Sequence, residues 1–535
     1  MHTCFERAVG AVLGCVAAVV LSGCGGSSST STTVTTTTMN ADGSTTSVTT
    51  TGGSTSGGST SGGSTSGGSS SGGSTSGGST SYTVGGTVSG LGGNESVTLL
   101  DNGGDAVAVT SDGAFMFPTQ LAGGSAYAVT VKSHTPGIAC SVTSGSGALG
   151  ATNVTDIAVS CAAGKETTLY SFSGGATGST PLAGLVIDGS GNLYGTTQQG
   201  GAHGHGTVFK LSSSGTETVL HSFGSPGDGQ DPQGPLIMDN AGNLYGATFH
   251  GGANGDGAIF KVATDNTETV LYSFGATRSD GQNPVGGLVM DGAGNLYGTT
   301  EIGGAYNSGT VFKLTASGAE TVLHSFLALG MGIDGQFPQR ALLIDSAGDL
   351  FGTTPNGGAD TAGTVFKLSA NGTMTILYSF GGTTDGRTPF AGVIEDSAGN
   401  LYGTTADGGA NGGGLGAGVV FSLSAAGKET VLYSFGATGK DGLNPYEGLV
   451  MDSAGNLFGT TRAGGASASG GARRGGTVFK LSPAGTETIL YSFGAAGAND
   501  GSSPQAALVM DGAGNLYGTT SAGGAHGDGT VFKID

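Results

Sequence analysis

The chain has 535 residues, with 112 Gly, no Trp and only 10% charged residues. This composition favours β-strands joined by tight turns over helices. The formal net charge of −20 comes with sparse Lys and Arg. That balance argues against a nucleic-acid partner, because binding to phosphates needs clustered basic residues.

The N-terminal stretch predicts an exported, lipid-anchored protein. Residues 1–23 form the expected signal peptide, in which Arg7 supplies the positive charge and residues 8–21 an apolar run too short for a comfortable membrane span. The run ends in Leu-Ser-Gly-Cys24, which resembles a bacterial lipoprotein signal. The resemblance implies that Cys24 is diacylated and becomes the mature N-terminus. An ordinary secretory peptide is the alternative.

The expected location follows from that anchor. The residue after Cys24 is Gly25, where Asp would signal retention at the inner membrane. We therefore expect a protein of the cell envelope, held by its lipid at the outer membrane or the cell surface.

Residues 24–81, beginning with the lipidated Cys, are almost entirely Ser, Thr and Gly. Such a segment has too few apolar side chains to offset the entropy of ordering its backbone. The sequence predicts a disordered tether, with a root-mean-square span of roughly 40 Å.

Residues 82–162 predict a small antiparallel β-sandwich. Short alternating runs such as "AYAVTVKS" and "TDIAVSC" are bounded by Gly, Asn and Asp turns. The module loosely resembles Ig-like or carboxypeptidase-regulatory-like sandwiches, which implies a spacer or a binding accessory. Cys140 and Cys161 are the two Cys left in the exported part, so we expect one disulfide between them.

Residues 165–535 consist of tandem repeats. The dodecapeptide "VMDGAGNLYGTT" occupies residues 289–300 and recurs unchanged at 509–520. Each of seven units has four β-type runs, "GLVMD", "NLYGTT", "GTVFKL" and "ETVLYSF", a pattern typical of propeller blades. An open β-solenoid is the rival architecture. The Asn or Asp of the repeated turn stands at Asn192, Asn243, Asn295, Asp349, Asn400, Asn456 and Asn515.

The phase of the repeats favours a closed ring over an open solenoid. The repeats begin with an outer strand at residues 166–172, and the last unit, at 508–535, lacks that strand. A Lys also precedes a Glu by seven residues in most units, and we expect each pair to lie directly opposite across a hairpin. The pairs are Lys210 with Glu217, Lys261 with Glu268, Lys313 with Glu320, Lys480 with Glu487 and, through ring closure, Lys533 with Glu166.

These units resemble the bacterial tandem family known as GloVer repeats, whose "GNLYGTT…GG…GTVFKL" core matches nearly every unit. NHL-type propellers are similar more weakly. The count of seven units predicts an all-β fold with a seven-bladed propeller. The resemblance implies a propeller-like exported protein with variable anchoring and no established activity, and it carries over no catalytic residue.

Six Asp of a "D-G-x-x-P" motif between blades are candidate ligands for a polar molecule or a divalent cation, because hard cations prefer oxygen. The alternative is a local role in the turn. Arg473 and Arg474, in the longest loop, are candidates for an anionic ligand. The six Asp are Asp228, Asp280, Asp334, Asp385, Asp441 and Asp500.

The "GGAxxxG" loops of the first and last units offer a weaker metal site, made of His203, His205, His526 and Asp528. Uncoordinated, exposed histidines are the alternative. The Asp that opens each "DGAGN" turn and the outer-strand Tyr or His are expected to serve capping and packing. The sequence has no nucleophile elbow, P-loop, dinucleotide fingerprint or zincin motif.

The expected function is a binding or structural module for a glycan, a protein or another surface component. The alternative is an envelope enzyme such as a propeller lyase, lactonase or glycosidase. We expect a monomer without a cofactor, a divalent cation aside. The variable loops place the ligand between the fourth and sixth blades, near Asp385, Asp441 and Arg473.

Replacing Cys24 by Ala should release the protein from membranes, because it removes the sulfur that carries the lipid. Fractionation of cells, with mass spectrometry of the mature N-terminus, measures this. An unmodified N-terminus at another residue would contradict the anchor.

Overall fold

The computed structural model describes residues 32–39, 45–52, 80–328, 333–381, 384–411, 416–466, 475–494 and 499–535. The predicted signal peptide and Cys24 lie outside the described residues. The chain divides into two compact units, residues 1–77 and 78–535. Within the described residues, no helix is long and apolar enough to cross a membrane.

The first unit contains a strand pair where a disordered tether was predicted. Strands β1 (Thr32–Met39) and β2 (Thr45–Gly52) pair antiparallel over their full length. Both are runs of Thr with Val, and β-branched residues favour extended backbone. The disordered tether over residues 24–81 as a whole stays a prediction.

The second unit begins with a sandwich of two four-stranded sheets, ordered β10-β12-β4-β7 and β11-β9-β5-β6. Its core contains Val97, Leu99, Ile157 and Val159, none of which is exposed to solvent. The strands are β3 (Ser81–Tyr82), β4 (Val84–Ser89), β5 (Val97–Asp101), β6 (Asp105–Val109), β7 (Gly113–Met116), β8 (Leu121–Ala122), β9 (Ala126–His134), β10 (Ile138–Thr143), β11 (Ser146–Ala148) and β12 (Val154–Ala163).

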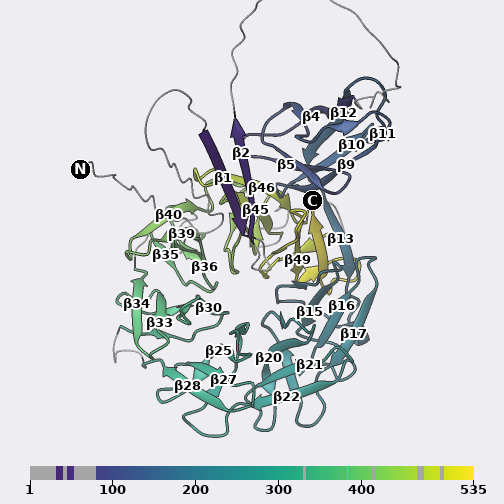
Figure 1. The fold of residues 1–535 in the computed structure, drawn as a ribbon. Helices are drawn as coiled ribbons and strands as arrows, with labels where there is room; N and C mark the ends of the chain where they lie inside the picture. Colours follow the sequence, from purple (N-terminus) through teal and green to yellow (C-terminus); the bar gives the residue numbers. More distant parts are fainter. Residues whose placement is uncertain are drawn as a thin grey trace, which may run out of the picture. The chain divides into compact units, whose positions relative to one another are not determined.

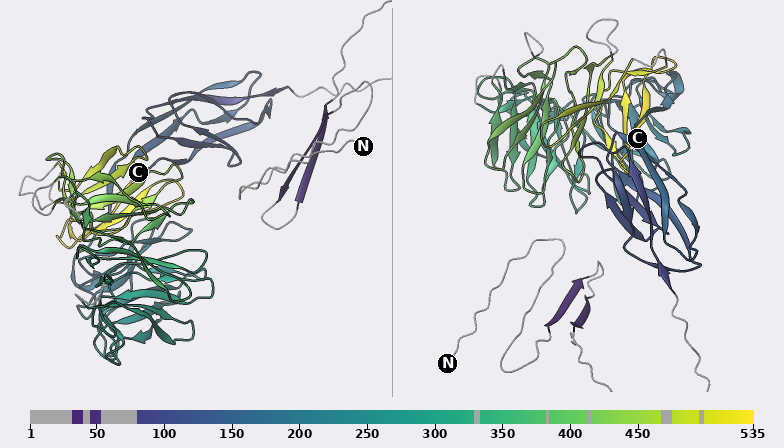
Figure 2. Two further views of the ribbon diagram at one scale, coloured as in Figure 1. Left: turned by 90° about the vertical axis from the view of Figure 1, so that its left-hand side faces the viewer. Right: turned by 90° about the horizontal axis from the view of Figure 1, so that it is seen from above.

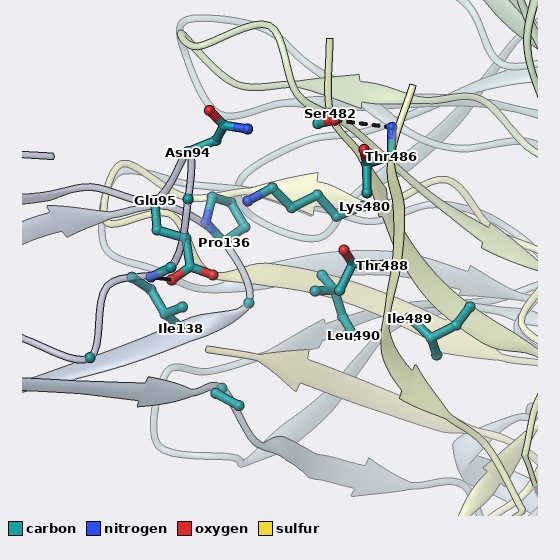
Figure 3. A pocket seen from close by; sticks show the side chains of 16 residues that line it. Asn94, Glu95, Pro136, Ile138, Lys480, Ser482, Thr486, Thr488, Ile489 and Leu490 are labelled. Atoms are coloured by element: carbon teal, nitrogen blue, oxygen red, sulfur yellow. Dashed lines mark hydrogen bonds between the residues drawn. The ribbon is translucent and has the colours of Figure 1, made fainter. Parts of the chain in front are cut away.

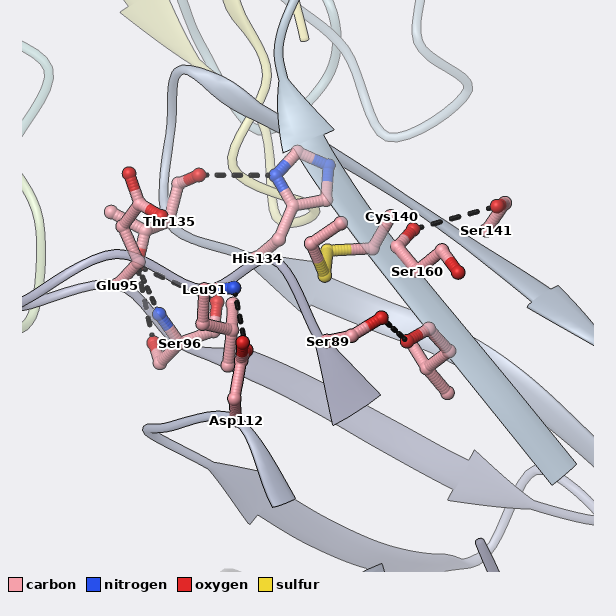
Figure 4. The surroundings of a disulfide bond; sticks show 12 residues. Ser89, Leu91, Glu95, Ser96, Asp112, His134, Thr135, Cys140, Ser141 and Ser160 are labelled. Atoms are coloured by element: carbon pink, nitrogen blue, oxygen red, sulfur yellow. Dashed lines mark hydrogen bonds between the residues drawn. A yellow bond between two sulfur atoms is a disulfide. The ribbon is translucent and has the colours of Figure 1, made fainter. Parts of the chain in front are cut away.

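The predicted disulfide is present in this sandwich. Cys140 in β10 stands directly opposite Cys161 in β12, and the two are bonded (Figure 4). β12 also pairs in parallel with β4, and Ser89 of β4 donates a hydrogen bond to the carbonyl of Val159 at 3.4 Å. The bridge therefore joins an edge strand of the sheet to its neighbour in the interior.

Seven antiparallel sheets follow and form a ring (Figure 1). Six have four strands, and the sheet of the second blade has β18 as a fifth. The all-β propeller prediction is confirmed. Blades one to three comprise β14 (Val186–Ile187), β15 (Leu193–Thr197), β16 (Thr207–Leu211) and β17 (Glu217–Ser222); β19 (Ile237–Met238), β20 (Leu244–Gly251), β21 (Ala258–Val262) and β22 (Glu268–Ser273); and β24 (Val289–Met290), β25 (Leu296–Thr300), β27 (Thr310–Leu314) and β28 (Glu320–Ser325).

The remaining blades repeat this order from the inner to the outer strand. Blades four to six comprise β30 (Leu343–Ile344), β31 (Leu350–Thr354), β33 (Thr364–Leu368) and β34 (Met374–Ser379); β36 (Ile394–Glu395), β37 (Leu401–Thr405), β39 (Val419–Leu423) and β40 (Glu429–Ser434); and β42 (Val450–Met451), β43 (Leu457–Thr461), β45 (Thr477–Leu481) and β46 (Glu487–Ser492).

The seventh blade combines both ends of the repeat region. Strands β48 (Val509–Met510), β49 (Leu516–Thr520) and β51 (Thr530–Ile534) come from the C-terminal end of the chain. The outer strand is β13 (Glu166–Ser171), which pairs antiparallel with β51, Glu166 lying opposite Ile534. The first and last repeat residues thus share one sheet.

Short strands join the segments between blades, and one 3-10 turn, η1 (Gly175–Thr177), lies after β13. In each of these pairs the "D-G-x-x-P" segment lies beside the "GGAxxxG" segment. They are β18 (Gly229–Pro232) with the end of β20, β23 (Gly281–Gln282) with β26 (Ile302–Gly303), β29 (Gly335–Gln336) with β32 (Asn356–Gly357), β35 (Gly386–Arg387) with β38 (Asp407–Gly408), β41 (Gly442–Leu443) with β44 (Ala463–Gly464), and β47 (Gly501–Ser502) with β50 (Ala522–Gly523).

The glycine of "NLYGTT" makes room for a phenylalanine of the next strand. A Cβ added to Gly195 in β15 would come within 2.8 Å of the Phe209 ring in β16, a distance that side chains essentially never adopt. The same contact recurs in every blade. The other pairs are Gly246 with Phe260, Gly298 with Phe312, Gly352 with Phe366, Gly403 with Phe421, Gly459 with Phe479 and Gly518 with Phe532.

Each of these phenylalanines packs edge-on against a phenylalanine of the preceding blade. The seven ring-to-ring distances lie between 4.9 and 5.3 Å. Such edge-to-face pairs are favourable beyond the area that they bury. The pairs are Phe172–Phe209, Phe223–Phe260, Phe274–Phe312, Phe326–Phe366, Phe380–Phe421, Phe435–Phe479 and Phe493–Phe532, all fully buried.

The two threonines of the motif bind different partners. In five of the seven blades the first donates to a backbone carbonyl of the next blade, and Thr519 of the last blade reaches Ala183 of the first at 3.2 Å. In five blades the second pairs with the Thr that opens the third strand, as Thr197 does with Thr207 at 2.9 Å. The other contacts between blades join Thr299 to Arg340, Thr353 to Ala391, Thr404 to Glu447 and Thr460 to Ala506.

The predicted pairing of Lys with Glu is wrong. The turn at residues 212–216 closes so that Glu217 stands opposite Leu211 and Lys210 opposite Thr218. Lys and Glu therefore point to opposite faces of the sheet. The ammonium of Lys210 instead lies 5.5 Å from the centre of the Tyr194 ring, a cation–π contact.

Replacing Phe172 by Ala should destabilise the propeller as much as replacing Phe223, the equivalent residue in mid-ring. Both lose a fully buried ring, which costs about 3–5 kcal/mol. Urea unfolding of the two variants measures this. A clearly smaller loss for Phe172→Ala would mean that the ring is open at this seam.

Candidate functional site

In the "DGAGN" turns, the Asp carboxylate accepts hydrogen bonds from nearby residues of its own blade. Asp188 accepts from the backbone N–H of Ser190 and Asn192, and from the side chains of Asn192 and Tyr194, at 2.7–3.0 Å. Partial burial works to raise the pKa of Asp188, but these four bonds outweigh it and hold the pKa below its usual value. The carboxylate is thus a structural cap.

The N-terminal sandwich contacts this side of the propeller. The backbone N–H of His134 donates to Ala513, in the "DGAGN" turn of the last blade, and that of Gly137 donates to Asp535, both at 2.9 Å. Figure 2 shows the sandwich on one side of the ring. Part of this face is therefore covered within the chain itself.

A cavity of about 440 Å³ lies between the sandwich and the sixth blade (Figure 3). Lys480 of β45 points into it and is only 8% exposed; burial lowers its pKa, and the charge of Glu95 works in the opposite direction. Thr486 and Thr488 add hydroxyl groups to the wall. The cavity carries charges of both signs and shares its walls with the domain contact.

The predicted "D-G-x-x-P" carboxylates are bound to their own blades. Asp228 accepts from His221 at 3.0 Å and from the N–H of Gly224 and Gly229, and it is only 8% exposed. This geometry matches the local turn role, with the carboxylates turned inward. The equivalent contacts join Asp280 to Tyr272, Asp334 to His324, Asp385 to Tyr378, Asp441 to Tyr433 and Asp500 to Tyr491.

A glutamate of the next blade faces each of several such aspartates. Burial first, and the charge of Asp280 second, raise the pKa of Glu320 to about 7. Glu429 beside Asp385 and Glu487 beside Asp441 have the same causes and the same value. Buried carboxyls of this kind remain protonated in the folded chain at mildly acidic pH.

The other predicted candidates are not brought together. Among the described residues, one group of three potential ligands has its atoms within 4.8 Å of one another. None of the predicted metal ligands, His203, His205, His526 and Asp528, belongs to this group. His205 instead lies 3.5 Å from Asp231. Arg473 and Arg474 lie outside the described residues.

The strongest departures from the repeat lie just before the inner strands, beside the centre of the ring. Two residues after the repeated Pro, most blades carry Ala or Gly, but the fourth carries Arg340 and the sixth Glu447. Their side chains meet at 2.8 Å across the intervening Ala391, 19% and 13% exposed. Burial raises the pKa of Glu447, and the Arg340 guanidinium offsets part of that.

An aromatic pair adjoins this ion pair. The rings of Phe390 and Tyr446 stack 4.9 Å apart at 10°, and the guanidinium of Arg462 lies 5.2 Å from the Tyr446 ring. Nearby, Gln339 donates to Glu301 at 2.8 Å. We call this set the axial cluster: Glu301, Gln339, Arg340, Phe390, Tyr446, Glu447 and Arg462.

Sequence reasoning missed every member of the axial cluster. It placed the ligand in the same arc, the fourth to sixth blades, but on Asp385, Asp441 and Arg473. The signal was available: aligning the repeats on their Pro isolates Arg340 and Glu447 as charged residues in a column of Ala and Gly.

A profile of the Gloeobacter/Verrucomicrobia repeat matches residues 125–343 and 340–535. The chain belongs to this family. No curated protein matches the chain.

Solved structures with similar folds share little sequence with the chain. A protein described as a gluconolactonase is 15% identical, with a TM-score of 0.31, over 52% of this chain and 80% of its own. The extracellular domain of a hybrid two-component system from B. thetaiotaomicron is 13% identical, with a TM-score of 0.44, over 72% and 43%. A protein from Bacteroides uniformis described as a 6-phosphogluconolactonase is 17% identical, with a TM-score of 0.38, over 58% and 83%. The chain thus spans less than half of the second.

The raised pKa values of Glu320, Glu429 and Glu487 predict that stability falls as pH rises from about 4.5 to about 7. In that window the unfolded chain releases protons that the folded chain retains, so the stability contribution is lost as pH passes the folded pKa. Thermal unfolding from pH 4.5 to 8 measures this. The Glu320→Gln, Glu429→Gln, Glu487→Gln triple variant should depend less on pH, and an equal dependence would contradict the assignment.

Proposed function

We propose that the chain is a lipid-anchored envelope protein that binds a carbohydrate over the axial cluster. The observation that carries the proposal is the aromatic stack of Phe390 on Tyr446, flanked by Arg462. The position after the repeated Pro varies between blades, and it carries an aromatic ring in the fifth and sixth blades alone. The scaffold itself needs no such residues there, because the equivalent positions of other blades fold without them.

The chemistry of the cluster suits a sugar ring. The C–H face of a pyranose is apolar with a slight positive charge, and it stacks on the negative face of an aromatic ring. Hydroxyl groups around the ring then require both donors and acceptors. Arg462 is exposed and provides donors, and Glu301 and Gln339 provide carboxylate and amide groups at half-buried positions.

The ion pair prepares this surface. Arg340 spans from the fourth blade to the sixth, and its contact with Glu447 positions the segment that carries Tyr446. The hydrogen bond from Thr404 to the carbonyl of Glu447 holds the same segment from the fifth blade. A platform that is fixed before the ligand arrives loses less entropy on binding.

The predicted anchor agrees with this role. A lipid on Cys24 and the Ser/Thr/Gly-rich segment would display the propeller beside the polysaccharides of the envelope. An enzyme of the lyase, lactonase or glycosidase type remains the alternative, and it would differ by consuming the bound sugar.

Replacing Tyr446 by Ala should weaken oligosaccharide binding about tenfold or more, equivalent to about 1.4 kcal/mol, because the platform loses its central ring. Phe390→Ala should have the same effect. The measurement is calorimetric titration with oligosaccharides found as binders on an array of bacterial and plant glycans.

The matched control is Phe249→Ala. Phe249 of β20 occupies in the second blade the position that Arg462, directly after β43, occupies in the sixth, and it lies outside the cluster. Its removal should change the affinity less than twofold. Equal losses in all three variants, or no glycan bound by the wild-type chain, would contradict the proposal. Cleavage of the ligand would favour the enzyme.

A further inference from the structure

The seam between the first and second blades brings together three side chains that can bind a metal. His221 lies in β17, Asp228 precedes β18, and Glu268 opens β22. The imidazole nitrogen and the carboxylate oxygens all lie within 4.8 Å of one another, and His221 Nε2 is 3.0 Å from Asp228. They form the one group of this kind among the residues that the structure describes.

The group contains two carboxylates and only one side chain, His221, that can carry a positive charge. Asp228 accepts from His221 and from the N–H of Gly224 and Gly229. Glu268 faces the same point, but its buried Oε1 accepts no hydrogen bond. The equivalent Glu of four other blades has the same unsatisfied oxygen, so what distinguishes this seam is the imidazole placed between two carboxylates. A cation bound here would contact all three side chains.

We propose that His221, Asp228 and Glu268 bind a divalent transition metal of the Zn²⁺ class. One imidazole nitrogen with two carboxylates is a donor set that suits Zn²⁺, with bonds of about 2.0–2.2 Å. On binding, the metal takes the Nε2 lone pair of the neutral imidazole, and the ring's single proton then resides on Nδ1. A fourth position stays open for water.

The site has both an entrance and a fixed frame. The His221 side chain is 20% exposed, so an ion can reach Nε2 from solvent, whereas that of Asp228 is 6% exposed. The ring of His221 packs edge-on against Phe223 at 4.7 Å, which limits its rotation. One carboxylate oxygen of Glu268 already lies within 4.8 Å of the other two ligand atoms.

The repeats contain two natural controls for this site. In the next seam, Tyr272 replaces the His beside Asp280 and Glu320. One seam further on, His324 binds Asp334 at 2.8 Å, but Met374 replaces the Glu. His, Asp and Glu thus coincide in the first of these three seams, although the same backbone surrounds all of them.

The test uses the purified full chain without a histidine tag, stripped with EDTA and titrated with Zn²⁺ by calorimetry. Co²⁺ absorption reports the coordination geometry. One equivalent should bind, and His221→Tyr should weaken it about tenfold or more. Tyr occupies this position in five other blades, so the variant keeps a residue that the fold accepts.

Met374→Glu provides the converse experiment. It completes the donor set beside His324 and Asp334, so a second equivalent of Zn²⁺ should bind. Glu268→Gln should weaken the first equivalent without affecting this second one. Retention of full Zn²⁺ affinity by His221→Tyr, no Zn²⁺ bound by the wild-type chain, or no gain from Met374→Glu would each overturn the proposal.

Discussion

The propeller depends on one packing contact, the edge-on stacking of a strand-three phenylalanine against a phenylalanine of the preceding blade. Phe209 fits beneath the second strand because Gly195 has no side chain, and it meets Phe172 at 5.1 Å. The glycine, the phenylalanine pair and the first threonine of "NLYGTT" together form the blade interface. A substitution at any of them strains or empties the seam, which explains why one dodecapeptide recurs unchanged.

In such a scaffold, the residues that hold the blades together and the residues that bind a ligand occupy different positions of the repeat. Residues that join blades repeat, and those that serve a ligand are free to differ. The axial cluster obeys this rule: Arg340, Glu447 and the Phe390–Tyr446 pair occupy columns that are otherwise mostly small or uncharged. The buried Asp and Glu of the seams have features of both kinds of residue. They repeat in most blades, as structural residues do, but some of their oxygens, such as Glu320 Oε1, accept no hydrogen bond.

The fold could be predicted from the period of the repeats and from the phase of their two ends. Register could not, because the spacing of Lys210 and Glu217 does not specify how the turn between them closes, and the turn placed Leu211 opposite the Glu.

The candidate site was harder to predict for a geometric reason. Arg340 and Glu447 are more than 100 residues apart in the sequence. Their side chains come within 2.8 Å because the folded ring brings the fourth and sixth blades together at its centre. The repeated Asp attracted attention because they carry charge, but a charge that six of the seven units repeat serves the turn first. Asp228 shows this, since its oxygens already accept three hydrogen bonds.

The central claim is that ligand binding resides where the repeat is broken at the ring centre. Hydrogen–deuterium exchange with and without a bound oligosaccharide tests it most directly, because it reports every segment at once. The account predicts slower exchange at residues 386–391, 443–448 and 461–463, and no change in the "DGAGN" turns. Protection confined to those turns or to the N-terminal sandwich would contradict it.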